Sequence, residues 1–280
     1  MLLGVHCSVA GGIENACVMA QTLGIDTFQI FTKSQRQWKE KAFTIEEGLS
    51  FKAKMKATGI KIAFSHCSYL FNLASTNEEL RNKSILGLVA ELHRCESLGL
   101  QFAVLHPGAN RLLTETESIR QIAEGLKLVL EQTAGLKAKV ALENTAGQGA
   151  AIGYKIAHLQ EILSIVGSER MGVCIDTCHA FAAGYDIRDE AGFDSLIQEI
   201  DSLVGLEKLW AFHVNDSKGE LGSRIDRHHH IGQGKMTLTP FQYLLKNFPH
   251  IPKVLETDKD NEMDEVNLQT LRSLIDLKDI

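Results

Sequence analysis

The chain has 280 residues, of which 44% are hydrophobic and 23% are charged, and this composition excludes a mainly disordered protein. Its formal net charge of −6 excludes a uniformly basic nucleic-acid-binding shell, but it leaves room for a local basic groove. No apolar run reaches the roughly 18 residues that a membrane span needs, and the first residues lack the basic start of a signal peptide. We therefore expect no membrane partner.

The cysteines indicate the redox compartment of the protein, and the absence of linkers indicates its number of domains. Six cysteines are scattered without a CxxC pair, a pattern typical of reduced thiols in the cytoplasm. No Pro-rich, Ser-rich or low-complexity linker divides the chain, so we predict a single domain over residues 1–280. No pattern signals oligomerisation, and we expect a monomer.

Short apolar segments alternate with longer amphipathic segments from end to end. We predict strands at residues 2–6, 26–31, 61–66, 102–106, 139–143, 172–176, 209–213 and 253–256. We predict helices at residues 12–23, 44–57, 77–98, 118–132, 154–166, 190–204, 239–247 and 264–277. Thr44 and Glu47 have the spacing of a capping box at the start of the second helix.

Eight consecutive strand-then-helix units predict an α/β fold of the (β/α)8 TIM barrel class. The alternative is a doubly wound open sheet, which usually carries a GxGxxG turn after its first strand. Residues 8–12 have no such pattern. The barrel is therefore the preferred prediction.

Seven of the eight predicted strands end in a histidine or an acid: His6, His66, His106, Glu143, Asp176, His213 and Glu256. In a TIM barrel the carboxyl ends of all strands face one mouth, where active sites form. Carboxylates gathered there would repel one another unless cations neutralise them. Imidazole and carboxylate donors without paired thiolates suit zinc, manganese or iron(II).

Two further pairs extend this set of donors. His179 follows Asp176 by three residues, and Asp226 precedes His228 by two residues in a predicted loop. Taken alone, the Asp226–His228 segment has the composition of an ordinary solvated loop.

Eight segments carry a specific resemblance, and they occur in order along nearly the whole chain. They are FTKSQRQW (31–38), HCSYLFNL (66–73), LHPG (105–108), LENTAGQG (142–149), CIDTCHAFAAGYD (174–186), HVNDSK (213–218), GSRIDRHH (222–229) and LET (255–257). The sequence thereby resembles endonuclease IV, the zinc-dependent apurinic/apyrimidinic endonuclease family.

The resemblance implies three zinc ions, with manganese accepted in one or more positions. In the implied arrangement, His66, His106 and Glu143 hold one ion, and Glu143 bridges to a second ion. The remaining ligands implied are Asp176, His213 and Glu256 for the second ion, and His179, Asp226 and His228 for the third. His6 matches no ligand position, and we interpret it as a supporting or rim histidine.

The implied activity is that of a deoxyribonuclease IV type hydrolase in DNA repair. It cleaves the phosphodiester 5′ to an abasic site in duplex DNA, leaving a 3′-hydroxyl and a 5′-deoxyribose phosphate, and it trims blocked 3′ ends. The implied mechanism is direct attack by metal-activated hydroxide, oriented by Glu143 as the catalytic residue, with no covalent intermediate. Arg36, Tyr69 and Leu70 are the implied DNA-binding residues.

Two other function classes fit parts of the pattern. A metal-dependent sugar isomerase on the same barrel would also gather histidines and acids at strand ends, but it would leave the Asp226–His228 pair without a role. A non-catalytic metal- or DNA-binding protein on a decayed barrel would not need the complete donor set with Glu143.

Overall fold

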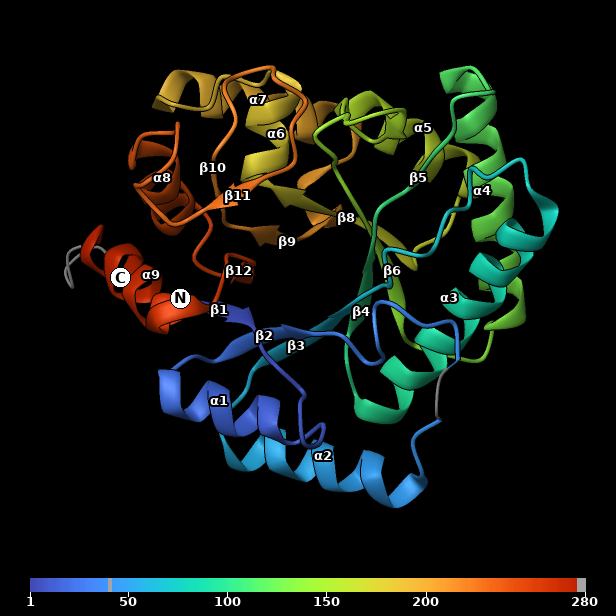
Figure 1. Ribbon diagram of the computed structural model, residues 1–280, viewed down its shortest axis with the longest axis horizontal. Helices are drawn as coiled ribbons and strands as arrows, with labels where there is room; N and C mark the ends of the chain where they lie inside the picture. Colours follow the sequence, from blue (N-terminus) through green and yellow to red (C-terminus); the bar gives the residue numbers. More distant parts are fainter. Residues whose placement is uncertain (40–41, 276–280) are drawn as a thin grey trace.

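Eight parallel strands form a closed barrel in the computed structural model, which describes residues 1–39 and 42–275 (Figure 1). In chain order the barrel strands are β1 Leu3–His6, β2 Thr27–Ile30, β3 Ile62–His66, β4 Phe102–Leu105, β6 Lys139–Glu143, β8 Met171–Asp176, β9 Leu209–His213 and β12 Lys253–Leu255. Each strand pairs with the next in this order, and β12 pairs with β1 to close the ring. The predicted (β/α)8 barrel is confirmed, and the open sheet is excluded.

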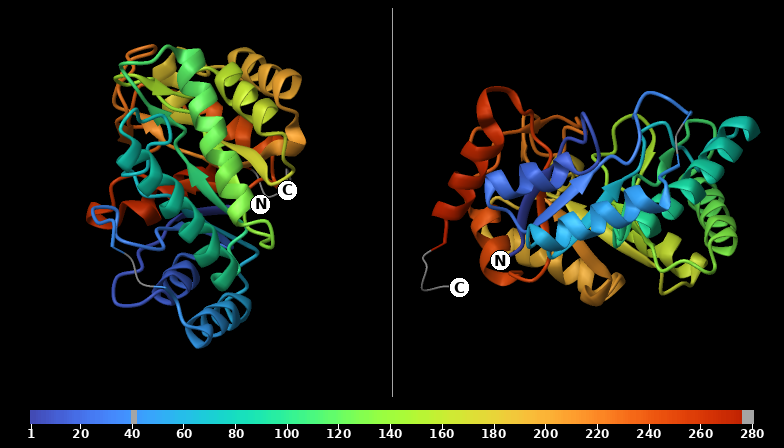
Figure 2. Two further views of the ribbon diagram at one scale, coloured as in Figure 1. Left: turned by 90° about the vertical axis from the view of Figure 1, so that its right-hand side faces the viewer. Right: turned by 90° about the horizontal axis from the view of Figure 1, so that it is seen from below.

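Helices surround the ring of strands, as the views in Figures 1 and 2 show. They are α1 Asn15–Leu23, α2 Ile45–Ala57, α3 Glu78–Leu98, α4 Glu115–Gln132, α5 Ile156–Val166, α6 Thr177–Ala183, α7 Glu190–Leu203, α8 Thr239–Asn247 and α9 Met263–Ser273, with short 3-10 turns at Leu206–Lys208 and Asp260–Glu262. Within the described residues, none of these helices combines the length and the apolar character needed to cross a membrane. The last helix is predicted to extend to residue 277, and residues 276–280 lie outside the described residues.

Capping boxes set where two of the helices, α2 and α4, begin. The predicted capping box is present, because Thr44 Oγ1 accepts from the Glu47 N–H at 3.1 Å and Glu47 accepts from the Thr44 N–H at 2.8 Å. A second capping box between Thr114 and Glu117 starts α4 at Glu115, three residues before the predicted start. The prediction missed it because the apolar periodicity of α4 begins only at Ile119.

One short helix and two pairs of short antiparallel strands were not predicted. Helix α6 follows β8 without a loop. The antiparallel pairs join β5 Gly108–Ala109 with β7 Ala151–Ile152, and β10 Asp216–Ser217 with β11 His228–His229 in a hairpin. Each of these strands has two residues, so it shows no alternation that a sequence pattern could reveal.

The interior of the barrel is filled by an apolar cluster, whose upper members form a layer beneath the strand ends. Its buried members are Phe64, Phe102, Val104, Ala141, Cys174, Ala211 and Val254, and the rings of Phe64 and Phe102 stack at 4.6 Å. Side chains on a strand alternate between its two faces, so the residue two positions further along points the same way. Six polar residues stand two positions beyond members of this layer: His66, His106, Glu143, Asp176, His213 and Glu256. The apolar layer is thus the floor of a polar site.

Candidate metal centre

Strand ends supply six of the nine donors predicted from the sequence. His66, Glu143, Asp176 and His213 are the last residues of β3, β6, β8 and β9. His106 and Glu256 directly follow the last residues of β4 and β12. All six therefore face the mouth at the carboxyl ends of the barrel strands.

Of the other three donors, His179 and His228 lie in elements that the prediction missed, and Asp226 lies in the loop between β10 and β11. Asp176 caps α6 by accepting the His179 N–H at 2.7 Å, which places His179 in the first turn of that helix. His228 lies in β11, opposite Ser217 of β10, and Asp226 stands two residues before it. A short helix and a short hairpin thus bring His179, Asp226 and His228 over the strand ends.

A buried carboxylate fixes the loop that follows β11. Asp216 accepts hydrogen bonds from the N–H groups of Gly232, Gly234 and Met236 at 3.1, 2.9 and 3.1 Å. A β-carbon on Gly234 would stand 2.3 Å from Asp216 Oδ1, so only glycine fits there. The Gly232-Gln233-Gly234 segment therefore has a structural role in holding the hairpin.

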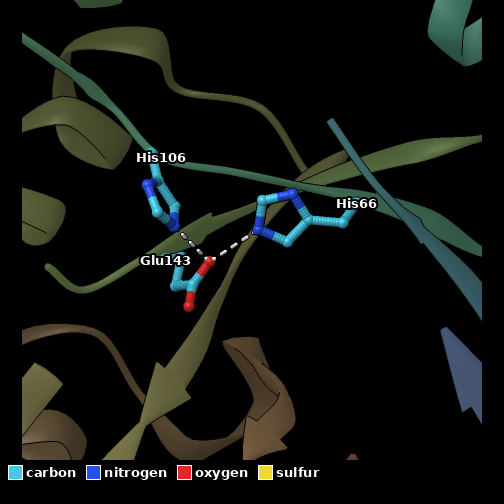
Figure 3. Close-up of side chains that lie close together, drawn as sticks. All are labelled: His66, His106 and Glu143. Carbon is cyan, nitrogen blue, oxygen red and sulfur yellow. Dashed lines mark hydrogen bonds and ion pairs between the residues drawn. The ribbon is translucent and has the colours of Figure 1, made fainter. Parts of the chain in front are cut away.

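Glu143 lies at the centre of the site and is fully buried. Its Oε2 atom lies 3.1 Å from His66 Nε2 and 3.0 Å from His106 Nε2, and both rings point toward this oxygen (Figure 3). Its Oε1 atom lies 2.8 Å from His213 Nδ1 and 3.4 Å from His179 Nδ1. One carboxylate thus contacts imidazoles from four different segments of the chain.

The nine donors fall into three groups, and within each group the candidate ligand atoms lie within 4.8 Å of one another. The groups are His66, His106 and Glu143; then Glu143, Asp176, His213 and Glu256; then His179, Asp226 and His228. Glu143 belongs to two of them. This is the grouping that the sequence resemblance implies, and the assignment of each residue to a particular ion stays a prediction.

A fourth group of donors combines Asp176 and His228 with Cys178. Burial raises the pKa of the Cys178 thiol to about 12, so at neutral pH it stays protonated and is a poor ligand. The imidazole and carboxylate groups are therefore the ones that suit a metal.

The four carboxylates of the site need cations to neutralise them. In the described part of the chain, the ion-pair partners of Glu143, Asp176, Asp226 and Glu256 are all histidines. A histidine neutralises a carboxylate only while it is protonated. Divalent cations would neutralise the same carboxylates while the imidazoles stay neutral. The donor set therefore fits zinc or a similar ion.

The pKa shifts follow from this pairing. Burial alone would raise the pKa of Glu143, but the adjacent His213 and His106 hold it well below its ordinary value. Burial alone would lower the pKa of His179 and that of His213. Contact with Asp176 nevertheless raises the pKa of His179 well above its ordinary value, and contact with Glu256 does the same for His213. Without a metal ion, these histidines therefore hold protons that a metal must displace.

The three predicted DNA-contact residues lie at or beside the mouth. Tyr69 is 61% exposed, and its ring centroid lies 5.3 Å from that of His66 and 5.7 Å from that of His106. Leu70 is half-buried next to it, and Arg36 is exposed in the segment after β2. Gln35 joins the two segments, because its Oε1 accepts the Tyr69 N–H at 3.2 Å.

Two amides that sequence reasoning missed hold the acids in place. Asn215 donates to Asp176 Oδ2 at 2.6 Å and accepts the Glu256 N–H at 2.8 Å. Asn144 accepts the Asp176 N–H at 2.6 Å. Both follow a strand-end donor by one or two residues, and this adjacency is the signal that could have identified them.

A third missed amide is Gln29 on β2, which contacts Glu256, His213 and His6. The strand was predicted to end at Phe31, so the search for polar residues at strand ends found an apolar residue there and missed Gln29. Counting two positions on from the buried Thr27 would have identified Gln29.

Comparison with known proteins defines first the class and then the family. Residues 18–277 match the family model described as the xylose isomerase-like TIM barrel, so the chain is a protein of that class. A protein of Chloroflexus aggregans named probable endonuclease 4 is 43% identical over 97% of both chains. The crystal structure of endonuclease IV from Thermus thermophilus is 35% identical, covers 98% of both chains and superposes with a TM-score of 0.87.

The chain therefore belongs to the endonuclease IV family, and it is a hydrolase of the nuclease type. A D-tagatose 3-epimerase-like protein has a TM-score of 0.77 at 18% identity over 98% of this chain and 97% of its own, a likeness that extends to the fold alone.

The pKa shifts predict how pH affects the metal-free protein. The raised pKa values of His66, His179 and His213 contribute stability that is complete below about pH 6.5 and is lost as pH rises through the folded-state values. The lowered pKa values of Glu143 and Glu256 contribute stability that is lost as pH falls below about 4.5. We expect the Tm of metal-free protein to be highest between these limits and to fall from pH 6 to pH 8.

Zinc should reverse this trend, because it needs neutral imidazoles. Thermal unfolding with and without added zinc should show a larger zinc-induced rise in Tm at pH 8 than at pH 6. A zinc increment that does not change with pH would contradict displacement of protons from these histidines.

Proposed function

We propose that this chain is a zinc-dependent apurinic/apyrimidinic endonuclease of DNA repair. It hydrolyses the phosphodiester 5′ to an abasic site in duplex DNA, leaving a 3′-hydroxyl and a 5′-deoxyribose phosphate, and it removes blocking groups from damaged 3′ ends. The observation that carries the proposal is the set of three donor groups joined at Glu143, in a chain of the endonuclease IV family.

Three zinc ions are proposed, one for each donor group, and manganese can replace zinc at one or more positions because it accepts the same donors. Zinc supplies Lewis acidity, which acidifies water and stabilises negative charge on a phosphoryl group. Burial of Glu143, Asp176 and His213 at the base of the mouth keeps bulk water from weakening these electrostatic interactions.

The residues of the chain orient the reaction. Glu143, anionic because of its histidine contacts, would accept a hydrogen bond from the attacking water and direct its oxygen at phosphorus. The bond that breaks joins phosphorus to the 3′ oxygen of the preceding nucleotide. No covalent intermediate is needed, and the buried Cys178, with its raised pKa, is a poor nucleophile.

Recognition of the lesion is proposed for the segments around Arg36 and Tyr69. The exposed Tyr69 ring and the half-buried Leu70 are suited to fill the space of an unstacked base step, and the Arg36 guanidinium is suited to a phosphate. We propose that the enzyme acts as a monomer in the cytoplasm. Its six free, buried cysteines support a reducing compartment.

A direct assay separates this activity from sugar isomerisation on the same fold. Zinc-loaded protein should nick a labelled duplex that contains one abasic site, without added magnesium, and should leave aldose sugars unchanged. Metal analysis should find close to three ions per chain, one for each donor group. Nicking should persist in dilute EDTA, because donor groups of this kind hold their ions better than an open magnesium site does. Turnover of an aldose with no nicking, or nicking that stops within seconds in dilute EDTA and returns with magnesium, would overturn the proposal.

Replacing Glu143 with glutamine tests the central carboxylate. The amide offers one neutral oxygen where two donor groups share two anionic ones, so incision should fall by about 100-fold or more. The matched control is Glu169→Gln, since Glu169 is an exposed acid paired with Lys208 before β8, at the opposite end of the barrel. Circular dichroism should show both variants folded. A Glu143→Gln variant with wild-type activity and metal content would remove Glu143 from the mechanism.

Replacing Tyr69 and Leu70 together with alanine tests recognition of the lesion. Incision of abasic duplex should fall strongly, while hydrolysis of a small phosphodiester should change little, because only the duplex requires unstacking. Leu86→Ala, which truncates an exposed leucine on α3, is the control and should affect neither substrate. Equal losses on both substrates would instead assign Tyr69 and Leu70 to packing at the barrel mouth.

A further inference from the structure

We propose that Gln29 of β2, held in place by His6, is the positioning residue for the central donor group of Glu143, Asp176, His213 and Glu256. This inference rests on the proposed metal centre and adds two residues to it that are not themselves among the donors. The argument comes from how each histidine of the site uses its two ring nitrogens.

Three of the histidines are oriented by backbone carbonyl groups. His66 Nδ1 lies 2.7 Å from the Cys67 oxygen, His179 Nδ1 lies 2.9 Å from the Asn144 oxygen, and His228 Nδ1 lies 3.2 Å from the Glu256 oxygen. In the neutral imidazole that a metal requires, an N–H donated in this way leaves Nε2 unprotonated and directs it toward the centre of the site. Ligand histidines are generally oriented by such a bond from the other nitrogen.

His213 uses its nitrogens in the opposite sense. Its Nδ1 faces the acids, at 2.8 Å from Glu143 Oε1 and 3.0 Å from Glu256 Oε2. Its Nε2 lies 2.8 Å from Oε1 of Gln29. The orientation of His213 therefore depends on a side chain, which a substitution can remove, whereas the carbonyl groups behind the other three histidines cannot be removed.

The Gln29 amide has one orientation that satisfies all its neighbours. Its Nε2 donates one hydrogen to Glu256 Oε1 at 2.5 Å and lies 2.9 Å from His6 Nδ1, which accepts the other. Its Oε1 is then left for the N–H of His213. A flipped amide would place its oxygen against the Glu256 carboxylate, and two acceptors would then face each other. Gln29 is fully buried, so water does not compete for its hydrogen bonds.

His6 thereby acquires a role that its place at a strand end did not reveal. It is nearly buried, its ring lies 4.1 Å from the Phe31 ring between centroids, and it belongs to none of the three donor groups. As an acceptor for Gln29 it fixes which way the amide points. We infer that a single chain of bonds, from His6 through Gln29, orients both His213 and Glu256.

Replacing Gln29 with methionine keeps the length of the side chain and removes all three bonds. Outer hydrogen-bond partners of metal ligands commonly contribute 10-fold to 100-fold in metal affinity. We therefore expect one of three zinc sites to weaken by about that factor, with the other two unchanged. Zinc affinity is measured by titrating metal-free protein in competition with a chromophoric chelator, and the visible spectrum of the cobalt(II)-loaded protein reports the changed ligand geometry.

The matched control is Thr27→Val on the same strand. Thr27 is fully buried two positions before Gln29, and its hydroxyl has no hydrogen-bond partner among the described residues. This variant should keep wild-type zinc affinities, cobalt spectrum and nicking activity. A loss shared by Thr27→Val and Gln29→Met would show a general effect of disturbing β2 and would overturn the proposal.

Two His6 variants test the same chain of bonds if Gln29→Met fails to fold. His6→Phe removes the acceptor and should weaken the same zinc site, whereas His6→Asn offers an acceptor near the position of Nδ1 and should restore its affinity. Unchanged affinity and spectrum in Gln29→Met or in His6→Phe would overturn the proposal. Failure of the wild-type protein to bind zinc would overturn the metal centre itself, and that outcome is distinct from a selective loss in the variants.

Discussion

The site depends on one constraint, which is that the carboxylate of Glu143 must remain charged although it is completely buried. An isolated carboxylate at such a position would have to take up a proton, because the interior solvates charge poorly. Four imidazoles contact its two oxygens, and their combined effect keeps its pKa low. The remaining acids of the mouth share the same histidines. Removing any one partner therefore changes the protonation of several neighbours, and a set of metal ions neutralises all of them together.

The barrel makes this arrangement possible because the side chains along each strand alternate between its two faces. Residues 64, 104, 141, 174, 211 and 254 form an apolar floor, and the residues two positions later form the polar layer above it. Because all strands are parallel and closed into a ring, these side chains converge without any loop having to fold around them. This is why the barrel and six of the nine donors could be predicted from strand ends alone. The same alternation placed His6 at the mouth, but alternation carries no information about whether a residue is a donor or a support.

What could not be predicted depends on contacts between segments distant in sequence. His228 is held by a two-residue strand whose partner lies eleven positions earlier, and His179 by a helix of seven residues that starts inside the site. Spacing alone indicated Asp226, His179 and His228 as possible donors, and only the family resemblance assigned them to an ion. Gln29 and Asn215 were missed for a different reason, because a neutral amide in a strand or loop has no pattern of charge or periodicity, and its role appears only when its partners are in place.

The net charge of −6 has a different meaning once the site is known. Four of the 35 acids, Glu143, Asp176, Asp226 and Glu256, face one another at the mouth rather than the solvent at large. The three divalent ions of the proposed centre carry six positive charges, which equals the formal deficit of the whole chain. The exposed cations that line this mouth, Lys218 and Arg227, then face a positive centre instead of a cluster of acids. An acidic protein can therefore present a phosphate-attracting surface at one end of its barrel, because the charge that a polyanion meets is local and includes the metal.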